Sequence, residues 1–290
     1  MDISNRKRRF NETTLTNFQA RYGEEVNDIA NPTNGFCERV LNRVTTRVFK
    51  TDPLAPGMIE KLVAVAQSAP SSHMSQSWSV ILVGPGESRN KLKKLLPASA
   101  PVNIEMMETA PALLIWVADL SRLALLDIDV SDSEFSMMAV IDATIAAQTL
   151  SLCAESFGLG VCYCGSFRTM PLDRIKTILK IPDNSIVVFG MFVGRPAFDK
   201  NTIRYGTRIW PKPRLPQNVV LHRNEYRVST ATDLADYDQI VMDYHNKPHV
   251  LAKDKEPNLS MSWSASMKRR AARMLTPILD KLQRQGFFTR

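Results

Sequence analysis

Residues 137–164 read MMAVIDATIAAQTLSLCAESFGLGVCYC, and this stretch decides the predicted fold. From Met137 to Phe157, apolar residues occur on almost every side of a helix, which is typical of a helix buried in a domain core or a subunit interface. Gly158-Leu159-Gly160 then ends the helix, and Val161–Cys164 follows as a strand. The pattern therefore predicts a long buried helix that leads directly into a strand.

Three further runs, on either side of this stretch, are rich in branched and aromatic residues and predict strands. They are Ser79–Val83, Ala112–Ala118 and Ile186–Val193. The second and third runs are apolar at nearly every position, so we expect both of their faces to be covered. Strands and helices do not alternate regularly along the chain, which favours the α+β class over a doubly wound α/β fold.

Three other segments are expected to be helical, because their apolar residues repeat along one face. They are residues 36–43, the segment from Pro56 to Ala69, and Ser264–Gln285, whose stripe of Met267, Ala271, Met274, Leu275, Ile278 and Leu282 predicts a docking helix. Residues 1–34 are polar and are interpreted as an N-terminal extension, partly helical over 14–29. After Gly194, repeated prolines indicate a loop-like chain.

The composition is that of an ordinary globular protein, with 44% apolar and 23% charged residues in a chain of 290. No apolar run reaches the roughly 20 residues that a membrane span needs, and the first residues lack the apolar stretch of a secretory signal. We therefore expect a cytoplasmic protein without a membrane partner. The four cysteines are expected to be small buried residues, not zinc ligands or disulfide partners; they are Cys37, Cys153, Cys162 and Cys164.

The formal net charge is +8, and much of it lies in two clusters, at residues 6–9 and at Lys268–Arg270 with Arg273. Terminal basic clusters are usually solvated arms. A basic face that binds nucleic acid is the alternative, but the chain lacks the interleaved aromatic and glycine pattern of an RNA-binding sheet. The same charge favours small phosphorylated ligands, so we expect no nucleic-acid partner.

Three short segments combine cations or hydroxyl groups with turn residues. Arg43-x-Thr45-x-Arg47 presents two guanidinium groups and a hydroxyl that can converge on a phosphate. Residues 70–78, PSSHMSQSW, hold hydroxyl, imidazole and amide groups that can contact the edge of a polar ring. Lys212-Pro213-Arg214-Leu215-Pro216 holds two cations between prolines that restrict the backbone. Each segment also has a simpler interpretation: a solvated helix end, a self-bonded turn and an exposed basic loop.

The sequence lacks the parts that several other chemistries need. It has no H-E-x-x-H metal motif, no Walker loop, and no G-x-G-x-x-G between a strand and a helix. His73 lies near serines, but neither a G-x-S-x-G elbow nor a neighbouring carboxylate supports a hydrolase. Anion-binding groups and neutral donors remain, which is what a protein needs when a bound cofactor carries the chemistry.

Together these segments form an ordered set that resembles the nitroreductase superfamily, in particular its branch of major oxygen-insensitive nitroreductases and NADPH–flavin oxidoreductases. The resemblance runs from about residue 36 to the C-terminus. The motifs that carry it are, in order, Arg43–Phe49, Ala69–Ser72 with Gln76–Trp78, the helix with Asp142, Ala146-Ala147-Gln148 and Ala154-Glu155-Ser156, Gly158–Arg168, Phe189–Pro196, Lys212–Pro216, His222–Tyr226 and Ile278–Arg290.

The resemblance implies an α+β nitroreductase-like fold, with a central mixed β-sheet flanked by helices in an interlocked homodimer. It implies one FMN-binding domain over residues 35–290, in which 217–290 wraps the partner or covers the site, and it leaves residues 1–34 as an extension. Two active sites would lie at the subunit interface. Because the flavin carries the chemistry, no side chain is expected to be a catalytic nucleophile and no metal is expected.

Site residues follow from the same resemblance. The positions that match the FMN phosphate and ring edge are Arg43, Thr45, Arg47, Lys212 and Arg214. The serine-rich stretch contributed across the dimer matches Ser71, Ser72 and His73, and the stretch beside the isoalloxazine matches Tyr163, Cys164, Gly165 and Ser166. Arg168 matches a position near the substrate and the nicotinamide cofactor. Arg273 is the candidate for the NADPH 2′-phosphate, because residues 272–277 read ARMLTP where the branch often has Lys-Glu-Ser-Arg-Pro.

The resemblance implies an FMN-dependent oxidoreductase that takes hydride from NADPH or NADH. Its expected acceptors are planar and electron-poor: nitroaromatic compounds, quinones or free flavin. A non-catalytic flavin-binding protein with a regulatory role is the alternative that keeps the same cofactor.

Overall fold

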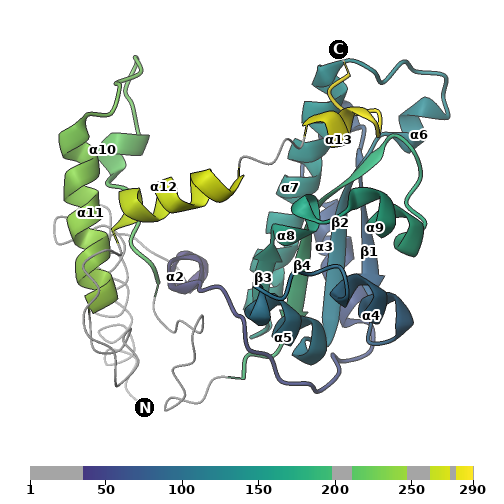
Figure 1. Ribbon diagram of the computed structural model, residues 1–290, viewed down its shortest axis with the longest axis horizontal. Helices are drawn as coiled ribbons and strands as arrows, with labels where there is room; N and C mark the ends of the chain where they lie inside the picture. Colours follow the sequence, from purple (N-terminus) through teal and green to yellow (C-terminus); the bar gives the residue numbers. More distant parts are fainter. Residues whose placement is uncertain (1–34, 198–210, 247–261, 275–278, 290) are drawn as a thin grey trace. The chain divides into compact units, whose positions relative to one another are not determined.

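The computed structural model describes residues 35–197, 211–246, 262–274 and 279–289, and in it the chain divides into two units. The sheet unit consists of the described residues within Thr45–Phe198 and Thr276–Arg290, and the helical unit of those within Met1–Val44 and Asp199–Leu275. Figure 1 labels the helices and strands of both units. The expected N-terminal extension, with its helix over residues 14–29, lies outside the described residues.

Four strands in the order β1-β2-β4-β3 form the centre of the sheet unit. They are β1 (Trp78–Val83), β2 (Ala112–Asp119), β3 (Gly160–Cys164) and β4 (Ser185–Gly194). Each matches a run that the sequence predicted, to within one residue at either end. The α+β class is confirmed.

Among the described residues the sheet is antiparallel throughout, so the expectation of a mixed sheet is wrong. β2 and β3 do run in the same direction, and the long helix α7 (Ser133–Ser156) carries the chain from the end of one to the start of the other. A crossover helix of this kind is what a parallel pair requires. Here β4 returns in the opposite direction and pairs between β2 and β3, which replaces one parallel pairing by two antiparallel ones.

The sheet unit contains three helices within segments that the sequence predicted to be helical and several short ones that it did not. α7 is confirmed and begins four residues before Met137, where the Asp132 carboxylate accepts a hydrogen bond from the Glu134 backbone N–H at 2.8 Å. The others are α3 (Met58–Gln67), η1 (Ser72–Met74), α4 (Glu87–Lys93), α5 (Pro101–Thr109), α6 (Ser121–Ala124), α8 (Ser166–Thr169), α9 (Leu172–Leu179) and α13 (Leu279–Gln283). Among these, α3 was predicted and α13 lies within the helix predicted over Ser264–Gln285. The others were missed, because helices this short contain too few turns for their period to stand out.

The helical unit contains α2 (Gly35–Asn42), α10 (Gln217–Val220), α11 (Ala231–Asn246) and α12 (Trp263–Met274). α2 is confirmed, whereas the expectation of a loop-like chain after Gly194 is wrong at α11. The missed signal is a capping box at the start of this helix. The Asp233 carboxylate accepts from the Thr230 N–H at 2.7 Å, and the Thr230 hydroxyl accepts from the Asp233 N–H at 3.3 Å.

The C-terminal segment differs from the single docking helix expected over Ser264–Gln285. Along the sequence, α12 ends before residues 275–278 and α13 begins after them, and these four residues are outside the described residues. Met267 and Ala271 of the predicted stripe are exposed on α12, so the predicted docking face is not buried against the described residues there. Leu282 of α13 does pack on the core of the sheet unit, and Phe287 beyond it is fully buried.

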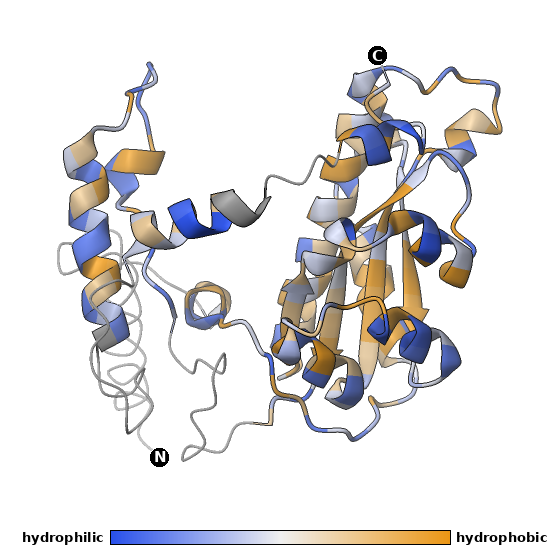
Figure 2. Ribbon diagram, viewed as in Figure 1, coloured by the Kyte–Doolittle hydropathy of each residue, from blue (hydrophilic) through white to orange (hydrophobic). Residues whose placement is uncertain are grey.

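Both faces of the two central strands are covered, as their apolar sequences predicted, because β2 and β4 are buried at every position. Figure 2 shows the apolar strands inside a shell of helices with polar outer surfaces. On one face Leu114 and Trp116 pack with α3 and α7. On the other face Leu113 and Ile115 pack with α4, α5 and α9.

α7 packs on the sheet through small side chains. Its fully buried alanines are Ala139, Ala143, Ala146, Ala147 and Ala154. Burial in the domain core is confirmed for this face, whereas Met137 and Ile141 are 53% and 44% exposed on another. By length and composition α7 could span a membrane, but half of its most apolar window is buried inside the protein.

The structure has no disulfide bond among the four cysteines. Cys162 and Cys164 are buried on β3, and Cys153 is half-buried on α7. Cys37 on α2 is exposed, so the expectation of burial is wrong for this residue, which lies on a short helix without any buried position.

A larger side chain on the alanine face of α7 should destabilise the sheet unit. We expect Ala147→Leu to lower the free energy of unfolding by about 1–3 kcal/mol, because the added atoms must displace either the helix or a strand. Urea denaturation followed by circular dichroism measures the loss. The matched control is Ala64→Leu at an exposed position of α3, and equal midpoints for the two variants would contradict the packing argument.

Candidate functional site

Residues 45–47 lie beside Gly160 and Val161, the first two residues of β3. The Thr46 N–H donates to the Val161 carbonyl at 3.1 Å, and Thr46 is 2% exposed. A Cβ at Gly160 would lie 2.2 Å from the Thr46 hydroxyl oxygen, so only glycine permits this approach. The contact fixes the backbone that carries Thr45 and Arg47, both of which remain partly exposed.

Two guanidinium groups lie close to the end of β3. The charges of Arg47 and Arg168 both act on the buried Cys164 thiol and favour its ionised form, as do hydrogen bonds from Ser166. Burial is nevertheless the larger effect and raises the pKa of Cys164 above its ordinary value. The thiol therefore stays neutral and packs in the core, while the two arginines form a positively charged edge beside it.

The polar groups of residues 163–168 are oriented by specific partners. The Tyr163 hydroxyl donates to the Gln148 side-chain oxygen on α7 at 3.0 Å, so this side chain lies on the α7 face of the sheet. Arg168 donates from Nη1 to the Val188 carbonyl at 2.8 Å. Ser166 Oγ accepts from Asn103 Nδ2 on α5 at 2.8 Å. Asn103 was missed, because nothing in its local sequence links it to this segment.

The serine loop, which we define as Ser71–Ser77, has an unusual backbone. His73, Met74 and Gln76 have φ of 51°, 56° and 49°, in the left-handed region that residues other than glycine rarely adopt. Such conformations cost free energy and persist only where surrounding contacts impose them. The loop is therefore held by the rest of the fold, in line with a functional site and against a turn that only bonds to itself.

Asp142 on α7 holds the first half of the serine loop. Its carboxylate accepts from the Ser72 N–H at 2.9 Å and from the Ser75 hydroxyl at 3.3 Å. Asp142 itself is 1% exposed. The sequence contained this residue within the family motif but did not show that it would meet residues about 70 positions away in the chain.

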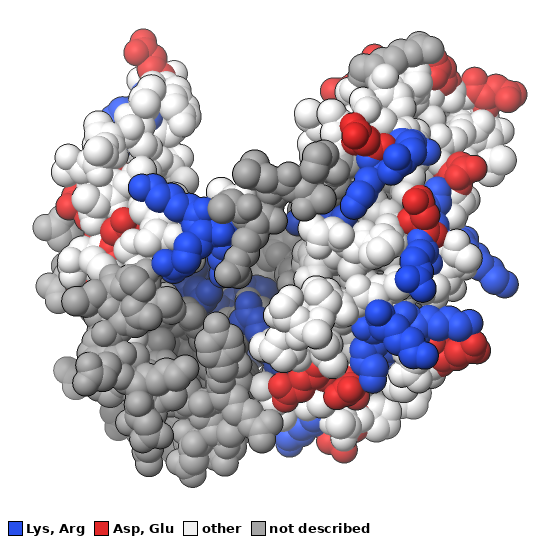
Figure 3. All heavy atoms as spheres, in the orientation of Figure 1, with Lys and Arg blue, Asp and Glu red and all other residues white. Residues whose placement is uncertain are grey.

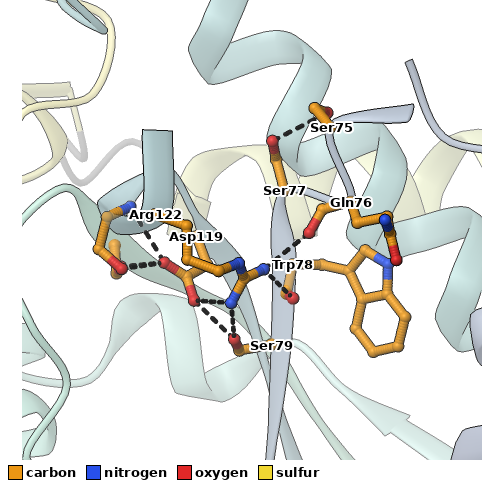
Figure 4. Close-up of polar contacts among 9 residues, drawn as sticks. Ser75, Gln76, Ser77, Trp78, Ser79, Asp119 and Arg122 are labelled. Carbon is orange, nitrogen blue, oxygen red and sulfur yellow. Dashed lines mark hydrogen bonds and ion pairs between the residues drawn. The ribbon is translucent and has the colours of Figure 1, made fainter. Parts of the chain in front are cut away.

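Asp119 and Arg122 hold the second half of the serine loop (Figure 4). Arg122 Nη2 donates to the Gln76 and Trp78 carbonyls at 2.7 and 2.8 Å, and its Nη1 donates to Asp119 at 2.9 Å. Burial acts to raise the pKa of Asp119, but hydrogen bonds from Ser121, Ser79 and Ser185 and the charge of Arg122 together hold it below its ordinary value. Neither residue was singled out in the sequence.

The remaining predicted site residues belong to the helical unit. Lys212 and Arg214 are exposed on either side of the buried Pro213, and Arg214 Nη1 donates to the carbonyls of Lys212 and Pro213 at 3.1 Å each. The Tyr237 hydroxyl also donates to the Pro213 carbonyl, at 3.2 Å, so the short basic segment has a fixed backbone. Arg43 follows α2, and Arg273 lies near the end of α12.

The structure thus sorts the candidates into three groups. The segments 45–47 and 163–168 meet at the β3 edge of the sheet. The serine loop precedes β1, the strand at the opposite edge of the sheet. Three strand spacings separate β1 from β3, which corresponds to roughly 14 Å. The third group is in the helical unit: Arg43, Lys212, Arg214 and Arg273. Within the sheet unit, the two edge clusters are therefore separate.

These groups can bind an anion and a polar ring, and they contain no metal cluster. Among the described residues no group of three or more His, Cys, Asp or Glu side chains could hold a metal ion. Figure 3 shows lysine and arginine interspersed with acidic side chains on the visible face of the sheet unit, and not gathered into one stripe there. Discrete cations of this kind suit a small phosphorylated ligand better than a nucleic-acid backbone.

Comparisons with known proteins show which family the chain is similar to. Residues 40–195 match the model of the nitroreductase family, and residues 212–290 match that of the nitroreductase family C-terminal domain. An FMN reductase (NADPH) from Bacillus subtilis is 32% identical over 74% of this chain and 84% of its own. An NADPH-dependent oxidoreductase from Staphylococcus aureus is 31% identical over 87% of this chain and 99% of its own.

A solved structure extends the likeness to three dimensions. The NADPH:FMN oxidoreductase from Vibrio harveyi, complexed with NAD+, has a TM-score of 0.73 and 28% identity to this chain. The comparison covers 89% of this chain and 100% of the other.

The ion pair that holds the serine loop should make stability depend on pH. We expect Asp119→Asn to cost about 2–4 kcal/mol at neutral pH, because several hydrogen bonds to a buried carboxylate are weakened together. The folded pKa of Asp119 lies below its ordinary value of 3.8, so this stability is present above that pH and is lost as pH falls through the folded pKa. Thermal unfolding between pH 7 and about pH 3 should show the two proteins converging.

The control for this prediction is Asp52→Asn, at an exposed position. Its midpoint should follow the wild type at every pH. A gap between Asp119→Asn and the wild type that stays constant down to the lowest pH would show that the Asp119 charge does not stabilise the fold.

Proposed function

Since this chain belongs to the nitroreductase family, we propose that it is an FMN-dependent oxidoreductase that uses NADPH or NADH as its reductant. The names of its relatives, an FMN reductase (NADPH) and an NADPH-dependent oxidoreductase, support this proposal. The observation that carries it in the structure is that the charges of Arg47 and Arg168 both act on Cys164, the last residue of β3. A cationic edge next to an oriented polar segment fits a phosphorylated ring cofactor.

The residues present fit FMN in chemical type. Arg47, Lys212 and Arg214 would hold the phosphate and ring edge together with Arg43 and Thr45, since guanidinium groups bind phosphate through paired hydrogen bonds. The polar edge of the ring would be met by Ser71, Ser72 and His73, and its flank by Tyr163, Cys164, Gly165 and Ser166. Tyr163 would contribute its backbone, because its side chain is bonded to Gln148.

When bound, FMN supplies the hydride acceptor and donor that the chain's side chains lack. Arg47 and Lys212, as cations near the ring, would favour the accumulation of negative charge and so favour reduction. Arg168 would orient the nicotinamide or the acceptor from its anchored position on Val188. No side chain has to act as a nucleophile, in agreement with the neutral Cys164 thiol.

The proposal includes a homodimer with a shared site. Its support is the position of the serine loop at the opposite sheet edge from residues 163–168. A second copy could supply its serine loop to the β3 edge of the first. The exposed apolar residues Met137 and Ile141 on α7 offer a surface that association would cover.

The proposed acceptors are nitroaromatic compounds, quinones or free flavin, and the proposed location is the cytoplasm, where NADPH is available. Arg273 is the proposed contact to the NADPH 2′-phosphate. A flavin-binding regulatory protein without turnover is the second candidate, since the same residues would hold the cofactor in either case.

The activity test uses the purified full chain incubated with FMN and freed of excess ligand. We expect a yellow protein that oxidises NADPH steadily when a quinone or nitroaromatic compound is added, with NADH measured in parallel to give the preference. A protein that retains FMN but does not turn over would support the regulatory candidate. A protein that fails to take up FMN at all would defeat the proposal.

Arg47 should be needed for cofactor retention. We expect Arg47→Ala to weaken FMN binding by about 10- to 100-fold, the range that follows from losing one charge-assisted hydrogen bond. Flavin fluorescence titration measures the dissociation constant. Arg174→Ala, at an exposed position on α9, is the matched control and should bind FMN like the wild type; equal affinity in both variants would remove Arg47 from the site.

A further inference from the structure

We infer that Arg122 is a positioning residue that, together with Asp119, sets the backbone of the serine loop and thereby the affinity of that loop for the flavin ring. The inference rests on the proposed function for its ligand and concerns two residues outside the cofactor-binding set. Arg122 acts through the loop and does not itself touch the ligand.

The serine loop needs contacts with residues outside the loop to keep its backbone conformation. Three of its residues adopt left-handed φ values, and none of them is a glycine. A free loop of the same sequence would relax from this conformation, since left-handed backbone is unfavourable for L-residues. The contacts that hold Gln76, the last of these residues, are therefore part of the site.

Arg122 contacts the backbone of the left-handed segment directly. Its Nη2 donates to the carbonyl of Gln76 at 2.7 Å, inside the strained segment, and to that of Trp78 at 2.8 Å, just after it (Figure 4). One planar group thus fixes two carbonyl directions two residues apart. A lysine ammonium on a flexible stem cannot reproduce this fork.

Asp119 fixes the direction of Arg122 in turn. It is 7% exposed at the end of β2, and its carboxylate accepts from the hydroxyl groups of Ser121 and Ser185 at 2.6 and 3.0 Å. Its own N–H donates to the Ser77 carbonyl at 3.0 Å. The carboxylate therefore orients the guanidinium from the core side, and the pair holds the loop from Gln76 onward.

The two anchors of the serine loop have different roles. Asp142 binds the Ser72 N–H and the Ser75 hydroxyl, so it contacts Ser72, one of the residues proposed to meet the ring. Within the loop Arg122 binds only the main-chain carbonyl of Gln76, and it makes no contact with the Ser71 or Ser72 side chain. Changing Arg122 therefore alters the shape of the loop without removing a binding group.

The test compares Arg122→Lys with Arg174→Lys, the same change at an exposed position of α9. Lysine can keep the ion pair with Asp119 but not both carbonyl bonds. In the flavin-free full chain we expect amide hydrogen exchange of residues 72–77 to accelerate about tenfold, with little change in the rest of the sheet unit. The FMN dissociation constant should rise by about the same factor, and the control should match the wild type in both measurements.

Unchanged exchange of residues 72–77 in Arg122→Lys would overturn the inference, as would an equal acceleration throughout the sheet unit, which would show a merely structural role. If Arg122→Lys does not fold, Ser79→Ala decides, because it removes a hydroxyl that accepts from Arg122 at 3.0 Å and donates to Asp119. A two- to threefold local acceleration (about that size for one weakened contact) is then expected, and none would sink the idea. Failure of the wild type to bind FMN defeats the proposed function separately, because the exchange measurement is made without flavin.

Discussion

The alanine face of α7 is the constraint on which the sheet unit depends. Five fully buried alanines let the helix backbone approach the strands closely, and larger side chains would force them apart. The same helix then presents Asp142 to the serine loop and Gln148 to Tyr163. Two candidate site segments at opposite sheet edges are therefore oriented by side chains of one rigid element, about six residues apart along it, or roughly 9 Å.

The serine loop shows how a fold can impose a conformation that its sequence does not favour. His73, Met74 and Gln76 have left-handed backbone, and charged groups on two sides hold them. On one side is Asp142, and on the other is Arg122 oriented by Asp119. At the β3 edge a close contact fixes the backbone instead. Gly160 allows Thr46 to approach and thereby brings Arg47 to the edge. One cluster is thus fixed by hydrogen bonds and the other by close packing.

Local patterns predicted the strands and the long helix because the hydrophobic pattern of each element lies within its own residues. β2 and β4 are apolar at every position, and α7 is long enough for its pattern to exceed chance. The short helices were missed for lack of turns, and α11 was missed although its capping box, Thr230-x-x-Asp233, was present. Of the site, the sequence identified the residues that carry family motifs, but not Asn103, Asp119 or Arg122, whose partners are distant in sequence.

The sequence by itself determined the α+β class, the boundaries of the strands, and the residue types suited to an anion and a polar ring. Those properties depend on residues that are close to one another along the chain, so they can be read from the sequence directly. Only the tertiary structure decided that β4 inserts between β2 and β3, so that the sheet is antiparallel, and that the serine loop lies at the opposite edge from residues 163–168. Strand order and long-range ion pairs depend on how elements pack around a shared core, and no local period encodes that packing.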